Sequence, residues 1–599
     1  MLTDAVAYFN ASNVQDRNFS KCYSIARSEG RHTVLYSRYF KLLVFQVFSV
    51  GRLWDNNRNG CRSLRRSVLG FLVFFPLFCR GIQGFVGTRL FADISPFDKF
   101  NPPLQSCCPM VVDPCPPPLP TCCVVGSGIA GLSMSFILQQ SKQFSKVTIL
   151  EREPILGMDS QSVDTTIRGE SVRLDTPPRA FSEGFYPNLM SMYLLAGIEI
   201  EPFSWAWSVS TLHAPRAMLK MGGQTIFGFR IPETNGAIWK SLFSSQTRAI
   251  ISDTLRFHRA MQQIMDGTDQ NSGLLATGEF LTQGAYSDAF IYDALLPILS
   301  MVCTCTYKSC LEYPMELVAD YFTKNSSSGQ YHSRYGSQDV VKKLSAGCEI
   351  KTGCPVSGIW HADPTKGAPR ARVCWSDQDG AEQEAFFDNV VVASQAHTAL
   401  RLVQDLSPEQ KNALSQFSFE YTTVSVHRDP ALMPTDRRDW LPMNVILPPK
   451  EDRRRESMFT MWCSAASKHW EDRTELAPLF QTWNPILSPK PELEMKRIVF
   501  ERPVVKLSTL NAMKQLEELQ GRGGIYFCGA YALRAIPLQE NGTGCAKLIA
   551  EKMGIPCGWE AITVARHAKR KREERTRANR SILCVAMVCA LSLNYVWSK

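Results

Sequence analysis

Short apolar runs recur in the central part of the chain, each bounded by glycine or charged residues. Thr121–Val125, Lys146–Leu150 and Ile525–Gly529 are five-residue runs of this kind, which is typical of buried parallel strands. Leu132–Gln140 and Gly542–Met553 follow two of these runs and have the composition of helices. The pattern predicts strand–helix units of an α/β protein whose last unit returns to the first.

The first hundred residues have a different pattern, in which two apolar runs flank a basic patch. Tyr39–Val50 and Ser67–Cys79 are apolar, and Arg62, Arg65 and Arg66 lie between them. A positive patch before a short apolar run is typical of a signal-peptide core. Such a core is shorter than the roughly 20 residues that a membrane span needs.

The segment Gly84–Ala92 follows this core and resembles the bipartite plastid-targeting leaders of complex algae, in which a phenylalanine follows the signal core. A membrane-associating or poorly ordered leader is the alternative interpretation, and a start placed too far upstream is another. Residues 101–120 are rich in proline, which disfavours both a helix and a central strand. We expect this stretch to be a linker that ends where the fold begins.

The C-terminal end joins a basic segment to an apolar one. Ala565–Arg580 is strongly charged, and Ser581–Trp597 is a mostly apolar run of 17 residues with Tyr595 and Trp597 near its end. Such a run is at the short limit of a membrane span, and aromatic residues favour the membrane interface. We expect a C-terminal membrane anchor with its basic flank on the cytoplasmic side. The alternative is an amphipathic or core-packed tail helix.

Composition narrows the possible partners. Apolar residues make up 45% and charged residues 20%, as in an ordinary globular protein. The formal net charge is +10, but residues 1–99 hold 14 Lys and Arg against 6 Asp and Glu, and residues 566–580 hold 8 against 2. The central body has no basic surplus, so we expect no nucleic-acid partner. The 20 cysteines lack paired Cys-x-x-Cys spacing, which predicts reduced thiols and no metal site.

The first predicted strand runs directly into a glycine motif. Gly126 would make the tight turn, Gly128 would let the backbone approach a pyrophosphate, and Gly131 would let the following helix pack on the strand. The N–H groups at the start of that helix would face the phosphates. Glu151 ends the second strand, 20 residues after Gly131, where it would accept hydrogen bonds from a ribose. Strand, glycines, helix, strand and acid in this order predict a dinucleotide site.

From Thr121 to Gly558 the chain resembles the FAD-dependent amine oxidase and phytoene desaturase superfamily. Within it, the chain is most similar to NAD/FAD-binding proteins found beside, or fused to, cyclopropane fatty acid synthases. Seven blocks carry the resemblance in order: VVGSGIAGL, VTILERE, Arg173–Pro202, Phe387–Val403, Phe480–Pro485, Phe500–Val505 and IYFCGAYA.

The resemblance implies FAD as the cofactor and a set of residues that would bind it. The backbone of Val356 would meet the adenine, and the late glycine turn with the last helix would close over the flavin. The implied cofactor-binding residues are Gly126, Ser127, Gly128, Ile129, Ala130, Gly131, Glu151, Arg152, Val356, Gly529, Glu540 and Asn541. Two segments depart from the family, LGMDS after the acidic residue and RAIPLQENG (Arg534–Gly542) over the flavin, and the second puts the substrate in question.

The implied fold class is α/β: a Rossmann-like FAD-binding domain on a parallel sheet, with an interleaved α+β substrate domain. The expected order is a leader at 1–100, a linker at 101–120, the FAD-binding domain at 121–240, 341–405 and 516–560, the substrate domain at 241–340 (mainly helical) and 406–515, and the basic segment with its anchor at 565–599.

The expected reaction is hydride transfer from a C–H bond of a hydrophobic substrate, such as an acyl lipid or isoprenoid, to flavin N5. This chemistry needs few ionisable residues, so no catalytic residue is identified from the sequence. His397 and His427 are the candidates, with a structural role as the alternative for each. An amine oxidase in the narrow sense and a non-catalytic flavin-binding partner of a lipid methyltransferase are the alternative functions.

Overall fold

The computed structural model describes residues 118–559 except 168, 216, 222–244, 326–328, 362–370, 455 and 467–478. The chain divides into two units, Met1–Asp113 and Pro114–Lys599, and every described residue belongs to the second. The predicted leader, nearly all of the linker and the C-terminal basic segment and anchor lie outside the described residues. Within the described part, no helix has both the length and the apolar character to cross a membrane.

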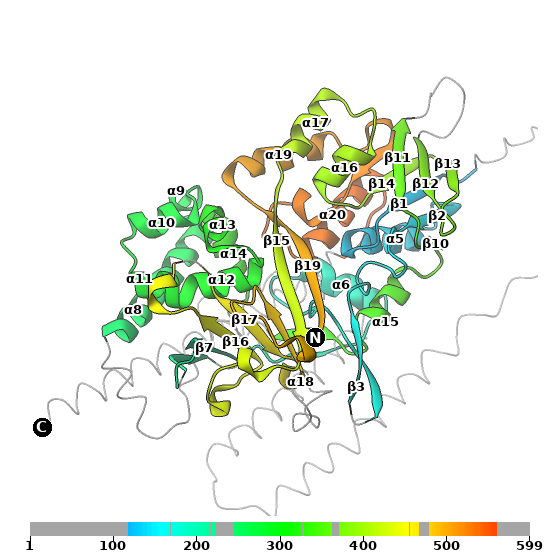
Figure 1. Cartoon of the computed structure of the whole chain (residues 1–599). Coiled ribbons are helices and arrows are strands. Elements are labelled where there is room, and N and C mark those ends of the chain that lie inside the picture. The colour runs from blue at the N-terminus through cyan, green and yellow to red at the C-terminus, as the bar shows by residue number, and fades with distance from the viewer. Residues whose placement is uncertain are drawn as a thin grey trace, which may run out of the picture. The chain divides into compact units, whose positions relative to one another are not determined.

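A five-stranded parallel sheet lies at the centre of the part that contains the glycine motif (Figure 1). Every neighbouring pair in it is parallel, with β1 in the middle. Ligands of such sheets bind beyond the carboxyl end of the strand where the order reverses, which here is β1. The sheet has the order β10-β2-β1-β14-β20, with β1 at Thr121–Val125, β2 at Lys146–Leu150, β10 at Glu349–Lys351, β14 at Asn389–Val392 and β20 at Ile525–Phe527.

Two helices from opposite ends of the described chain pack on each other beside this sheet. They are α5 (Ile129–Ser141) and α20 (Gln539–Lys552). A Cβ added to Gly542 of α20 would lie 2.8 Å from Cγ2 of Ile129, and the hydroxyls of Ser133 and Thr543 are 3.1 Å apart. Small residues thus bring the start of α20 against the start of α5, as close helix packing requires.

A seven-stranded mixed sheet forms the second part, in the order β19-β15-β18-β17-β16-β7-β8. Its long strands β15 and β19 run between the two parts in Figure 1. Because β7 pairs with β16, the stretch from β7 to β8 belongs to this sheet. The sequence analysis had assigned it to the FAD-binding domain, since an apolar strand does not reveal which sheet it joins. The strands are β7 Trp207–Thr211, β8 Leu219–Met221, β15 Ser418–His427, β16 Met443–Leu447, β17 Met458–Trp462, β18 Phe480–Trp483 and β19 Glu494–Val504.

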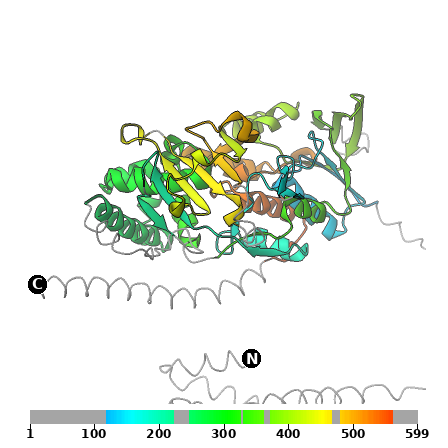
Figure 2. The same ribbon diagram turned by 60° about the horizontal axis from the view of Figure 1, so that its bottom comes forward.

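A group of helices packs beside the mixed sheet, as both Figure 1 and Figure 2 show. All residues of α12 are buried, which explains the apolar composition of this stretch. The group contains α8 Ser245–Met265, α9 Gln270–Gly273, α10 Thr277–Gln283, α11 Asp288–Phe290, the π-helix η1 Ile291–Leu295, α12 Leu296–Cys303, α13 Tyr307–Glu312 and α14 Met315–Asn325.

Smaller elements connect these layers. An antiparallel sheet is formed by β11 Val356–His361, β12 Ala371–Ser376 and β13 Glu382–Phe387, a second by β5 Phe181–Ser182, β9 Gln330–Ser333 and β6 Ile200–Pro202, and a hairpin by β3 Val163–Ile167 and β4 Glu170–Leu174. The other helices are α6 Pro187–Leu195, α15 Gly336–Leu344, α16 Ala396–Leu402, α17 Pro408–Ser415, α18 Cys463–Ala466 and α19 Leu507–Glu518. Short 3-10 turns are η3 Pro430–Leu432, η4 Arg437–Asp439, η5 Lys450–Asp452, η7 Pro491–Leu493, η8 Arg522–Gly524 and η9 Ala530–Ala532.

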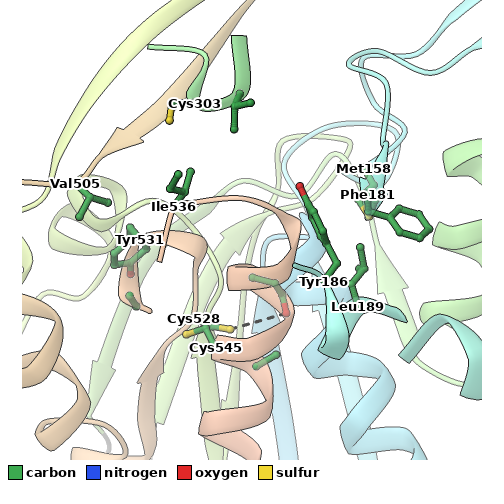
Figure 3. Packing of buried hydrophobic residues seen from close by; sticks show 14 of the residues in the cluster. Met158, Phe181, Tyr186, Leu189, Cys303, Val505, Cys528, Tyr531, Ile536 and Cys545 are labelled. Atoms are coloured by element: carbon green, nitrogen blue, oxygen red, sulfur yellow. Dashed lines mark hydrogen bonds between the residues drawn. The ribbon is translucent and has the colours of Figure 1, made fainter. Parts of the chain in front are cut away.

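One buried apolar cluster extends through both parts of the molecule. Figure 3 shows its members near the start of α20, where Ile536, Tyr531 and Val505 lie on one side and Tyr186 of the α6 start lies on the other. Ile536 is fully buried and Cys303 at the end of α12 is nearly so. The parallel sheet, the helical group and β19 therefore meet around the segment that begins α20.

Candidate functional site

The turn after β1 accepts only glycine at two of its three motif positions. Gly126 has φ +100°, and a Cβ there would lie 2.8 Å from the carbonyl oxygen of Ala393. A Cβ on Gly131 would lie 2.0 Å from the carbonyl oxygen of Gly126. Real Cβ atoms do not approach backbone atoms this closely, so both glycines are required for the strand, turn and helix to pack.

Gly128 is different, because its missing side chain faces open space. It caps α5 with φ −63° and ψ 177°, which any residue can adopt, and a Cβ there would meet no atom within 4 Å. No side chain caps this helix end. The unpaired N–H groups of its first turn are an anion site of the kind that binds pyrophosphates. Gly128 is flanked in the chain by Ser127, Ile129 and Ala130, which were also predicted to bind the cofactor. Ser127 is fully buried.

Glu151 holds the glycine turn in place. Its Oε2 accepts hydrogen bonds from the backbone N–H of Ser127 at 2.9 Å and from the Ser127 hydroxyl at 2.5 Å, and its Oε1 accepts one from the N–H of Glu153. The Ser127 hydroxyl oxygen also accepts the N–H of Gly157 at 2.6 Å. Arg152 is exposed and pairs with Glu153 at 3.2 Å. Glu151 directly follows β2 and lies beside the glycine motif. Its contact with a ribose stays a prediction.

The strand predicted to meet the adenine lies next to Glu151. The N–H of Cys354 donates to the carbonyl oxygen of Glu151 at 2.8 Å, and the N–H of Gly353 donates to that of Glu153 at 2.9 Å. Val356 begins β11 two residues later and is half-buried. The structure therefore brings the segment of Val356 next to Glu151 and the glycine turn, both of which precede it by more than 200 residues in the sequence.

The late segment places Gly529 and Asn541 at the same end of the sheet. Gly529 follows β20, and a Cβ there would lie 2.4 Å from the ring of Tyr531. Asn541 is fully buried in the first turn of α20, and its Nδ2 donates to the carbonyl oxygen of Leu533 at 3.2 Å. Its Oδ1 is buried without a hydrogen-bond partner. Buried polar atoms are nearly always paired, so this oxygen has the property of an atom that meets a bound group.

Glu540 makes a different set of contacts, which anchor α6. Its carboxylate accepts hydrogen bonds from the backbone N–H and the Nδ2 of Asn188 and from the N–H of Leu189, at 2.7–3.1 Å. These donors are at the start of α6, where a carboxylate is favoured. Burial raises the pKa of the Glu540 carboxyl to about 7, and the three donors oppose this rise. All three contacts are with the protein itself, and the predicted contact of Glu540 with the cofactor stays a prediction.

The unusual segment Arg534–Gly542 contacts the helical group. The Nε of Arg534 donates to Oε1 of Glu316 in α14 at 2.7 Å. Within the same segment Ile536 is fully buried. This segment therefore fills the junction between the two parts with one apolar side chain and ties it to α14 with an ion pair.

His427 is part of a closed hydrogen-bond chain inside the mixed sheet. Its Nδ1 accepts the N–H of Asp429 at 3.1 Å, so the ring proton is on Nε2 and is donated to the hydroxyl of Thr482 at 2.7 Å. Thr482 in turn contacts Thr460, whose hydroxyl donates to Leu432. Burial lowers the pKa of His427 to about 4. This geometry fits the structural alternative for His427.

His397 is at the surface end of α16. It is half-exposed, its Nε2 lies 3.3 Å from Oε1 of Glu501, and its ring packs edge-on against Phe419 at 4.8 Å. Phe419 in turn contacts the ring of Tyr531 beside Gly529. His397 is thus connected to the site through two aromatic rings, and a catalytic role for it stays a prediction.

Sequence reasoning did not single out Arg179 or Arg502, although both lie inside blocks that carry the family resemblance. Each has a half-buried side chain whose Nε is enclosed without a hydrogen-bond partner. An arginine in an otherwise apolar or proline-rich block was the available signal, as in TPPRAF and FERPVV. Their proximity depends on the tertiary structure.

Comparison with known proteins gives one family match and a shared fold. Residues 124–194 match the model of an NAD(P)-binding Rossmann-like domain. A fatty acid isomerase from P. acnes that produces CLA superposes with a TM-score of 0.50 at 14% identity, covering 72% of this chain and 98% of that one. No curated protein matches the chain.

Two further solved structures have lower scores. A putative protoporphyrinogen oxidase from Exiguobacterium sp. 255-15 has a TM-score of 0.47 at 13% identity, over 72% of this chain and 98% of that one. A redesigned putrescine oxidase has a TM-score of 0.46 at 12% identity, over 72% and 99%.

The fold class predicted from the sequence is confirmed. The chain has a Rossmann-like domain on a parallel sheet, and the fatty acid isomerase shares its fold across the described part. At 14% identity this likeness concerns the fold alone.

Proposed function

We propose that the chain is a FAD-dependent oxidoreductase that removes a hydride equivalent from a C–H bond of a hydrophobic substrate. The observation that carries the proposal is the open, uncapped start of α5 at Gly128, with Glu151 and the β11 segment on one side of it and α20 on the other. The βαβ unit alone would suit NAD(P) equally well. The return of α20 to the same sheet end is what favours a flavin.

The residues present fit the group that the proposal assigns to them. A side chain at Gly128 would project into open space, so a pyrophosphate can approach the N–H groups of α5 there. The Oδ1 of Asn541 is buried and unpaired in the first turn of α20. Both features are unexplained by the protein's own packing and are satisfied by a bound dinucleotide.

When bound, a flavin supplies the hydride-accepting chemistry. The chain's own contribution is to bind, orient and exclude water. The start of α5 would bind the pyrophosphate, Glu151 and the backbone near Val356 would orient the adenosine, and the start of α20 would place its helix dipole toward the flavin. Apolar residues around Ile536 would exclude water from the reacting carbon.

The decisive experiment compares the full-length wild type with Gly128→Val. We expect the wild type to purify with the visible absorbance of a flavin and to release FAD on denaturation. The variant should lose the cofactor while its thermal unfolding midpoint without cofactor stays unchanged, because a Cβ at this position meets no atom within 4 Å and the backbone there suits any residue. Gly131→Ala is the comparison, since its Cβ meets the Gly126 carbonyl and should destabilise the fold itself.

The results separate the alternatives. Release of NAD(P) instead of FAD, or a Gly128→Val variant that keeps its flavin, would sink the proposal. Anaerobic bleaching of the flavin by unsaturated lipid but not by amines would favour the lipid oxidoreductase over the amine oxidase. Flavin that no candidate substrate bleaches would favour the non-catalytic partner. The resemblance to proteins found beside cyclopropane fatty acid synthases stays a prediction, as do the membrane anchor and the plastid location.

A further inference from the structure

Arg502 is a cation with an enclosed, unpaired Nε at the junction of the two parts. It is on β19 opposite Glu420 of β15, and no hydrogen bond or salt bridge joins its guanidinium to any described residue. Glu420 is engaged elsewhere, because its carboxylate accepts from the N–H and hydroxyl of Thr306 and from the hydroxyl of Ser309. The carboxylate of Glu420 on the neighbouring strand therefore takes its hydrogen bonds from the helical group and not from the guanidinium of Arg502.

Arg179 is a second such cation close to the first. Its Nη2 donates to the carbonyl oxygen of Met158 at 2.8 Å, and its Nε is enclosed and unpaired. Its acidic neighbours are occupied, because Asp175 accepts the N–H and hydroxyl of Ser337, and Asp159 pairs with an arginine of β4. Burial lowers the pKa of Arg179, the negative charges of Asp175 and Asp159 oppose this change, and the positive charge of Arg502 adds to it.

The surroundings of Arg502 place it on the substrate side of the site. Burial raises the pKa of Tyr186 at the start of α6 and that of Cys305 after α12. The positive charge of Arg502 lowers both pKa values, so Arg502 lies near both residues. Figure 3 shows Tyr186 between Ile536 on one side and Met158 on the other, all of them buried. Arg502 is therefore near apolar side chains of the junction, whereas Arg179 contacts Met158, whose neighbour Gly157 packs against the turn at Gly128.

Two half-buried arginines with enclosed, unpaired Nε atoms are costly for a folded protein, since each loses hydration there and gains no hydrogen bond. Arginine forks match the geometry of oxyanions, which they bind with two parallel hydrogen bonds. We propose that Arg502, with Arg179 beside it, binds the carboxylate of an acidic hydrophobic substrate, such as a fatty acid. This inference rests on the proposed function, whose substrate class it specifies.

A phosphate of the cofactor is the other oxyanion that these arginines could take. The structure favours the substrate carboxylate for Arg502, because this residue is on a strand of the mixed sheet and close to Cys305 of the helical group. The open start of α5 already offers the pyrophosphate its donors. The experiment below distinguishes the two sources by measuring cofactor content and carboxylate binding separately.

The test titrates oleate, and oleyl alcohol as its uncharged counterpart, into the full-length protein and follows tryptophan fluorescence. Arg502→Gln should weaken oleate binding by about 10- to 100-fold, as expected for the loss of charge-assisted hydrogen bonds. It should leave oleyl alcohol binding and flavin content unchanged. Arg497→Gln on the same strand is the matched control, because Arg497 already pairs with Glu494 at 2.9 Å, and we expect it to bind oleate like the wild type.

The thermal unfolding midpoint of Arg502→Gln without ligand should be equal to or above that of the wild type. This result would support a binding role, because the folded variant no longer encloses a charged group with an unpaired donor. If Arg502→Gln does not fold, Arg502→Lys is titrated instead and should show a smaller loss of oleate affinity.

Three results would overturn the proposal: no oleate binding by the wild type, equal binding by the variant, or loss of flavin in place of oleate. Oleate binding that depends on Arg502 in a protein without flavin would uphold the carboxylate site and reject the proposed function.

Discussion

At the scale of single residues, burial and hydrogen bonding decide what each candidate can do. Glu151 and Glu540 were expected to meet the cofactor, and His427 was a catalytic candidate with a structural role as the alternative; each satisfies neighbouring protein groups in the structure. Asn541 and Arg502 keep polar atoms without partners. Unsatisfied atoms at the junction are therefore better indicators of the site than residue type alone.

His427 carries a prediction about acid stability. Its folded pKa of about 4 lies below its ordinary value of 6.5, so the unfolded chain takes up a proton first as the pH falls. The free energy of unfolding should therefore decrease from pH 6.5 to 4, by up to about 3 kcal/mol from this residue. His427→Gln can still donate to Thr482 and should lack this part of the decrease.

Urea unfolding of wild type and His427→Gln at several pH values measures the effect. A stability difference between the two proteins that stays constant across this range would contradict the buried neutral histidine. Retained flavin content in the variant would support its structural role.

At the scale of elements, the contact of α20 with α5 and α6 assembles the site. Gly542 lets α20 approach Ile129, and Glu540 binds the start of α6. Both residues lie in the first turn of α20, directly beside the unpaired Asn541. The position of this helix start thus depends on two packing contacts, one on each side.

Glu540 should give the α20–α6 contact a pH dependence of the opposite sign. Its folded pKa of about 7 is above its ordinary value of 4.5, so the folded state holds a proton that the unfolded state releases. The contribution of Glu540 to the free energy of unfolding should therefore fall as the pH rises from 4.5 to 7. The difference in free energy of unfolding between wild type and Glu540→Gln should narrow by up to about 3 kcal/mol over that range.

The matched control is Glu551→Gln on the same helix, where Glu551 forms a surface ion pair with Lys547. Its stability difference from the wild type should vary little with pH, because exposed pairs contribute little. Parallel pH profiles for wild type and Glu540→Gln would count against a proton on Glu540.

At the scale of the whole molecule, the cofactor-binding and substrate parts are interleaved along the chain and share one apolar cluster. The strands of the parallel sheet come from widely separated segments, and β15 and β19 run between the parts. Such an arrangement brings residues of the mixed sheet, such as Arg502, to the junction of the two parts. In the sequence, the apolar and basic runs of the two terminal segments differ from the strand–helix pattern of this central part.

The predicted C-terminal anchor can be tested by shortening the chain after Trp559. If Ser581–Trp597 inserts into a membrane, the full-length protein should float with liposomes and the shortened protein should remain in solution. The shortened protein should keep its flavin, because the elements of the proposed site end before residue 560. Equal flotation of both proteins would reject the anchor.

The sequence alone determined the local parts of the site. The strand, glycine turn, helix and acid from Thr121 to Glu151 follow from short-range sterics, since Gly126 and Gly131 have no room for a side chain. The pattern also predicted the returning β20–α20 unit, because buried strands and helices have their own periodicities.

Only the tertiary structure decided which residues meet across long distances in the chain. It placed the stretch from β7 to β8 in the mixed sheet, enclosed His427 in a hydrogen-bond chain, and left the Nε atoms of Arg179 and Arg502 enclosed without hydrogen-bond partners. The physical reason is that pairing, burial and the neutralisation of charge depend on neighbours in space, and these neighbours come from segments hundreds of residues apart.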